Sequence, residues 1–193
     1  MKTLVCFVAA ILLFSAVANG QSKPNDTIAR QLKALGAEST ITLTHDSASN
    51  MSKVMAVSSN FSESEAKAAD VRAMNFAAGF LYPGQSLERS PDQILVTFWV
   101  LAKQNRFGNG HALVMQLDGQ TVDLGDSRYV ARPRDGMEYL NFNLSREVLA
   151  RVASGSNVRF TLGGAGFTFS SDQLKMLANL LLLSDTAYSK IAI

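Results

Sequence analysis

Cysteine is almost absent from this chain of 193 residues. The one cysteine, Cys6, lies inside an N-terminal apolar run that extends from Leu4 to Phe14. If this run is removed, as argued below, no thiol remains, which excludes a disulfide, a thiolate metal ligand and a cysteine nucleophile. Many extracellular eukaryotic domains use disulfides, so a cysteine-free mature chain favours a bacterial origin.

The sequence also lacks an excess of charge. Lysine and arginine number 18, aspartate and glutamate number 16, and the net charge is +2. Proteins that bind nucleic acid usually carry a concentrated basic stripe, which is missing here. The apolar run at the N-terminus is shorter than the roughly 20 residues of a membrane-spanning helix. We therefore expect no nucleic-acid partner and no stable membrane span in the mature chain.

The first 20 residues have the layout of a secretory signal peptide. Lys2 supplies a positive start, the apolar run follows, and small residues then lead to Gly20. Cleavage after Ala18 and cleavage after Gly20 both fit this pattern. The sequence therefore predicts an exported protein, periplasmic or extracellular, and an uncleaved N-terminal anchor is the less favoured alternative.

The rest of the chain predicts one mainly β domain of the α+β class. We expect a tail and a short helix over residues 21–38, a single β-rich domain over 39–184, and a C-terminal tail over 185–193. Short runs of β-forming residues, mostly joined by hairpin signals, predict an antiparallel sheet or sandwich of about six to nine strands. Short helices are expected near both ends, including one at the C-terminus.

Local signals support this fold prediction. Residues 139–144 alternate apolar and polar side chains, as a half-buried strand does. Asp118-Gly119 is typical of a tight hairpin turn. Ser145 is placed to begin a helix, and Ser170 with Gln173 predicts a capping box before the last helix. Ser62 and Glu65 make a similar box earlier in the chain.

Two other stretches give less direct predictions. Residues 72–82 fit a strand and a helix almost equally well, and we favour the strand. Residues 94–101 are apolar at both odd and even positions, which predicts a central strand buried on both faces, with Trp99 in the core.

Four segments together carry a resemblance: LVTFWV, QLDGQTVDLGDSRY, EYLNFNLSREVLARVA and VRFTLGGAGFTFSSDQLKML. In this arrangement the second half of the mature chain resembles small exported bacterial β-rich proteins and lipoproteins that have no established activity. The resemblance implies a β-rich domain outside the cytoplasm. It implies no catalytic residue.

Residues suited to catalysis are few. The two histidines of the chain, His45 and His111, are far apart in the sequence and are expected to be exposed at strand ends. Because no metal-binding spacing such as HExxH is present, we predict no metal site and no cofactor. Gly125-Asp126-Ser127 is interpreted as a polar turn, and the nearby acidic residues, Glu138 included, as solvated strand ends.

A binding surface is the more favoured hypothesis. The candidate residues are His111, Arg128, Tyr129, Arg132 and Arg134, which lie in or near predicted loops and edges. Tyr82, Tyr129 and Tyr139 are expected to be partly exposed.

Three functions remain open. The favoured one is a non-enzymatic exported domain that binds a protein or an envelope component through loops on a β scaffold. The alternatives are an exported hydrolase that uses His111 with a nearby carboxylate or serine, and a structural or stress-related envelope protein without a specific ligand.

Overall fold

The structure is a computed structural model that describes residues 26–117 and 119–186. The expected signal peptide, Asp118 of the hairpin turn and residues 187–193 of the expected tail lie outside the described residues. Four helices are described: α2 (Asp26–Leu35), α3 (Glu63–Ala68), α4 (Arg146–Ser154) and α5 (Ser171–Leu183). In this part of the chain, no helix is long and apolar enough to cross a membrane.

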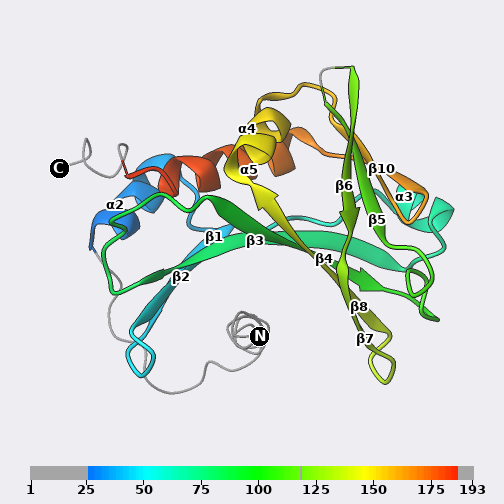
Figure 1. The fold of residues 1–193 in the computed structure, drawn as a ribbon, viewed down its shortest axis with the longest axis horizontal. Helices are drawn as coiled ribbons and strands as arrows, with labels where there is room; N and C mark the ends of the chain where they lie inside the picture. Colours follow the sequence, from blue (N-terminus) through cyan, green and yellow to red (C-terminus); the bar gives the residue numbers. More distant parts are fainter. Residues whose placement is uncertain (1–25, 118, 187–193) are drawn as a thin grey trace, which may run out of the picture.

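Ten strands form two antiparallel sheets, which confirms the mainly β prediction (Figure 1). The six-stranded sheet has the order β1-β2-β3-β4-β8-β7, and the four-stranded sheet has the order β10-β9-β5-β6. The first contains β1 (Ile41–Asp46), β2 (Met51–Val57), β3 (Ala73–Pro83), β4 (Gln93–Leu101), β7 (Arg128–Arg132) and β8 (Met137–Ser145). The second contains β5 (Ala112–Leu117), β6 (Gln120–Asp126), β9 (Arg159–Leu162) and β10 (Ala165–Thr168).

The helices and the four-stranded sheet all cover the same face of the six-stranded sheet (Figure 1). We call this the inner face. Phenylalanine rings fill the space between the layers, with ring centroids 5.2 Å apart for Phe98 and Phe160 and 4.9 Å apart for Phe160 and Phe169. Because these rings come from both sheets, the phenylalanine cluster joins the layers into one core.

The predicted capping signals are confirmed at three helices. Ser62 forms a capping box with Glu65 at α3, and Ser170 forms one with Gln173 at α5. The Ser145 side chain accepts a hydrogen bond from the backbone N–H of Val148 at the start of α4. Each serine satisfies a backbone donor that the first helical turn leaves without a partner.

The favoured strand prediction for residues 72–82 is confirmed by β3, the longest strand. Gly79 lies where β3 runs very close to β2. A Cβ atom at this position would stand 2.5 Å from the carbonyl oxygen of Val54, so a side chain would collide with backbone. This glycine is therefore required by the close approach of the two strands.

Three predictions about burial are wrong. The side chains of β4 are buried on the inner face, but Leu95, Trp99 and Leu101 on the opposite side are only half-buried. Trp99 is therefore outside the main core. Tyr82, expected to be partly exposed, keeps only 4% of its surface. The reason is that the other layers of the fold cover one face of the six-stranded sheet and leave the other without a described helix or strand.

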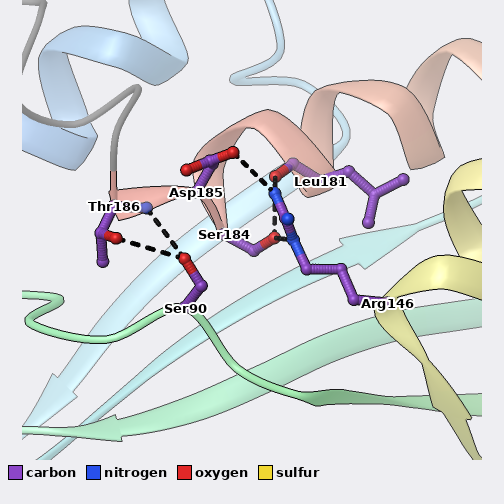
Figure 2. A network of polar contacts seen from close by, with 6 residues as sticks. All are labelled: Ser90, Arg146, Leu181, Ser184, Asp185 and Thr186. Carbon is purple, nitrogen blue, oxygen red and sulfur yellow. Dashed lines mark hydrogen bonds and ion pairs between the residues drawn. The ribbon is translucent and has the colours of Figure 1, made fainter.

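The last two helices are held together by Arg146, the first residue of α4 (Figure 2). Its guanidinium group donates to the Leu181 carbonyl oxygen at 3.2 Å, to Ser184 Oγ at 3.1 Å and to Asp185 Oδ2 at 3.0 Å. A cation at this place satisfies carbonyl groups at the C-terminal end of α5 and is favourable to the helix dipole. We interpret this network as structural.

Candidate functional site

The structure separates the five predicted binding residues. Arg128, Tyr129 and Arg132 belong to β7, the edge strand of the six-stranded sheet, and Arg134 lies exposed in the turn before β8. Tyr129 is paired with the buried Leu140, so its side chain faces inward. Arg128 and Arg132 alternate with it and face the other side. His111 comes from the segment before β5 and contacts only Tyr129 of this set among the described contacts.

Tyr129 connects His111 to the buried carboxylate of Glu138, and we call these three residues the His111 junction. The rings of His111 and Tyr129 are stacked, with centroids 5.8 Å apart and an interplanar angle of 8°. The Tyr129 hydroxyl donates a hydrogen bond of 2.9 Å to Glu138 Oε2. Burial, together with the hydrogen bond to Glu138 and the negative charge of that carboxylate, raises the pKa of Tyr129 to about 12. This hydroxyl therefore remains protonated at neutral pH.

Glu138 is the central residue of this junction, and its predicted place at a solvated strand end is wrong. Its side chain is 1% exposed and also accepts hydrogen bonds from the backbone N–H groups of Arg106 at 2.7 Å and Phe107 at 2.9 Å. The carboxylate thereby ties the connection between β4 and β5 to β8. A signal for burial was present, because position 138 shares its parity with Leu140 and Phe142.

The His111 junction does not contain an assembled hydrolase site. His111 Nδ1 lies 3.7 Å from Asp126 Oδ1, which is beyond hydrogen-bond distance. Ser127, from the predicted polar turn, is 8% exposed, and neither its Oγ atom nor His111 Nδ1 has a hydrogen-bond partner among the described residues. A serine nucleophile requires a base in hydrogen-bond contact, and these contacts provide none.

The second histidine, His45, also has a structural role. His45, expected to be exposed, is 3% exposed, and its Nδ1 atom lies 3.0 Å from Ser52 Oγ. Because the Ser52 hydroxyl donates its proton to the Gly84 carbonyl oxygen at 2.6 Å, His45 Nδ1 must be the donor in the first contact. His45 therefore cannot act through this nitrogen as a base for Ser52. Within the described ranges, no group of three histidine, aspartate or glutamate side chains could hold a metal ion.

The uncovered face of the six-stranded sheet is the most distinctive surface of the described chain. Strand alternation and register place ten large apolar side chains on it, among polar ones such as Asn75, Asn141 and Asn143, and we call it the outer face. These apolar side chains are all half-buried, and they include both a tryptophan and a tyrosine. They are Met51, Met55, Val57, Leu81, Leu95, Trp99, Leu101, Val130, Met137 and Tyr139.

Basic side chains lie within this apolar area, on β2, and along one edge of it, on β7. Lys53, Arg128 and Arg132 face outward, whereas Asp46 is the one acidic residue at an outward-facing position of the described strands of the six-stranded sheet. The Asp46 carboxylate accepts hydrogen bonds from Ser49 and Ala48, which lower its pKa. The guanidinium carbon of Arg132 lies 5.5 Å from the centroid of the Tyr139 ring, a cation–π contact. Burial lowers the pKa of Lys53, in keeping with an apolar surrounding.

Three surface hollows of the described chain lie elsewhere. One, of about 440 Å³, is next to α3 and mixes acidic and basic side chains, including Glu63, Asp70 and Lys103. The others lie beside α5 and at the β5–β6 turn. His111 and the apolar area of the outer face line none of these three, apart from Val57 at the margin of the hollow beside α5.

Comparisons of the chain with protein-family models, with curated proteins and with solved structures found no match. The functional argument therefore depends on the residues and contacts of this chain alone.

Proposed function

We propose that this protein is an exported, non-enzymatic binding domain that holds a protein or an envelope component on the outer face. The observation that carries this proposal is an apolar and aromatic sheet face with basic side chains within it and along one edge, and with no described helix or strand over it. Soluble proteins usually cover such a surface with their own elements or use it to bind.

The outer face carries the residue types that are common at binding interfaces. Trp99 and Tyr139 are directly paired across β4 and β8, and Arg132 lies over the tyrosine ring. Tryptophan, tyrosine and arginine are the residues that contribute most often to the binding energy of interfaces. Two of the predicted binding residues, Arg128 and Arg132, thus belong to the proposed surface. Tyr129 and His111, both half-buried, belong to the junction around Glu138 instead.

The hydrolase hypothesis receives no comparable support. The His111 junction holds the β4–β5 connection in place through Glu138, and the described contacts of His111 include no hydrogen-bonded acid or serine. Export is proposed from the N-terminal sequence, which has the layout of a signal peptide.

Site-specific photo-crosslinking tests the binding proposal. A photoreactive phenylalanine analogue replaces Leu95 on the outer face in one variant and Leu182 on α5 in the other. Leu182 is a matched control because it is the one large apolar side chain described as exposed, at 40%, and it lies on α5, which covers the inner face.

In cells that export the protein, position 95 should form a saturable crosslink to one partner, protein or lipid, whereas position 182 should not. Equal labelling at both positions, or none at position 95, would contradict the proposal.

A further inference from the structure

We infer that the outer face binds a single-chain anionic amphiphile, with its aliphatic chain along β4 and its carboxylate or phosphate at Arg132. This inference rests on the proposed function and names the ligand class for the same surface. The apolar side chains of Leu95, Trp99 and Leu101 project from one side of β4. They extend over six residue steps, or about 20 Å at the usual rise of a strand, which suits a long acyl chain.

The paired backbone of β4 and two polar side chains beside it favour an aliphatic occupant over an extended peptide. Thr97 donates to Asn141 Oδ1 at 2.8 Å, and Asn141 donates to the Arg128 carbonyl oxygen at 2.9 Å, so these two side chains are already engaged. The backbone of β4 is paired on both sides, by β3 and β8. A peptide lying across this area would leave its own backbone groups without partners, which is costly in an apolar contact. An acyl chain has no such groups.

The three methionines of the apolar area suit a flexible chain. Met51 and Met55 come from β2 and Met137 from β8. Methionine is unbranched and adapts its shape to its neighbour, which is why it is common at surfaces that accept varied apolar ligands.

The basic side chains of the outer face indicate that one end of the ligand carries negative charge. Arg132 is exposed, stands beside Tyr139, and has no acidic partner among its described contacts. A guanidinium group binds carboxylate and phosphate through paired hydrogen bonds. Lys53 and Arg128 add positive charge on the same face. An occupant with an anionic end is therefore complementary to this surface.

Two other occupants fit the outer face less well. A second copy of the chain, docked face to face with β7 over β7, would bring Arg128 and Arg132 against the same arginines of the other copy, which is unfavourable. A planar membrane would first meet the β1–β2 and β7–β8 hairpins, which extend away from the helices on the side of the outer face (Figure 1). Their turns are polar, with Asn50 and Arg134 among their residues.

Fluorescence of Trp99 gives a direct test, because it is the one tryptophan of the chain. The mature protein is titrated below micelle formation with palmitate, lysophosphatidate, hexadecanol and a fatty acid brominated along its chain. We expect saturable binding of both anionic ligands, a shift of the Trp99 emission to shorter wavelength, and quenching by the brominated chain. Tighter binding of palmitate than of lysophosphatidate would identify a free acid as the source of the anion, and the reverse order would identify a phosphate headgroup.

The variant Arg132→Gln should weaken the binding of both anionic ligands by about tenfold, the usual size of one charge-assisted contact. Arg159→Gln is the matched control, since it removes the same charge from an exposed position of β9 and should leave the affinity unchanged. Circular dichroism of each variant checks that the fold is retained.

Three results would overturn the inference. They are the absence of any response to both anionic ligands, equal binding of hexadecanol and palmitate, and quenching that Arg159→Gln alters as much as Arg132→Gln does. If an acidic amphipathic peptide shifts the Trp99 emission while the amphiphiles do not, the ligand class is wrong but the binding function stands. If crosslinking at position 95 also fails, both are wrong.

Discussion

The two faces of the six-stranded sheet come from the same strands but differ in what they contact. On the inner face, Phe98 is fully buried, and its ring centroid lies 6.0 Å from that of Phe142 on β8 and 5.2 Å from that of Phe160 on β9, so it contacts rings from both sheets. On the outer face, the next residue, Trp99, is half-buried and no described helix or strand lies over it. The inner face is required for the layers to pack, whereas the outer face has no packing partner among the described elements.

The large apolar side chains of the outer face are therefore not explained by packing against another described element. A sheet with one face in solvent usually alternates apolar and polar residues. Here β4 carries leucine and tryptophan on its uncovered side, and β8 carries Met137 and Tyr139. Variants at neighbouring positions of one strand compare the two faces directly, because the backbone is the same.

The largest contrast is expected between Phe98→Ala and Trp99→Ala. Loss of the Phe98 ring leaves a cavity in the core and should lower the free energy of unfolding by about 3–5 kcal/mol. Loss of Trp99 removes cross-strand contacts on a half-buried surface and should cost about 1 kcal/mol. Urea unfolding, followed by circular dichroism so that the tryptophan is not needed as a probe, measures both. Equal losses would show that the outer face is part of the core.

A smaller contrast is expected at Glu138 and Tyr139, which are neighbours on β8. Glu138→Gln keeps the shape of the side chain but replaces one carboxylate oxygen by an NH2 group, which is a hydrogen-bond donor. The two backbone N–H groups and the Tyr129 hydroxyl around this position are also donors, so the new NH2 group faces a donor instead of an acceptor. We expect a loss of about 2–3 kcal/mol, since hydrogen bonds to a buried charge are among the stronger ones. Tyr139→Phe on the outer face should change stability by about 0.5 kcal/mol or less. The same unfolding experiment separates the two outcomes.

The features that were predicted correctly from the sequence are those that depend on residues close together in the chain. The helix starts at Ser62, Ser145 and Ser170 were predictable because a cap involves residues three positions apart. The alternation of β8 was predictable for the same reason. Which side of a strand is covered depends on other layers of the fold. Trp99 was therefore placed in the core by its apolar neighbours, although the covering elements pack on the opposite face.

The errors at Glu138 and His45 have a different origin. Both residues have side chains that usually remain in solvent, so their chemical type predicts exposure although strand parity predicts burial. Their burial depends on partners that are distant in the sequence, such as the N–H groups of Arg106 and Phe107 for the carboxylate. Of the predicted site residues, Arg128 and Arg132 share the outer face because two residues on a strand share a side. The grouping of Trp99 with them required the strand order.

The smallest effect concerns the inward-facing Tyr129 at alkaline pH. Its pKa of about 12 in the folded protein lies above the ordinary value of 10, so the folded state retains a proton that the unfolded state releases. Stability linked to this group is therefore fully present below about pH 10 and is lost as the pH rises towards 12. Absorbance of ionised tyrosine, with unfolding measured at several pH values, should show a late ionisation and a parallel loss of stability.

Tyr129→Phe should reduce both signals. A late component remains, because burial also raises the pKa of Tyr82. Tyr139→Phe, on the outer face, is the matched control and should keep the late step attributed to Tyr129. If Tyr129→Phe leaves the late ionisation unchanged, the hydroxyl does not donate to Glu138. Tyr129 would then take part in the junction only through its ring contact with His111.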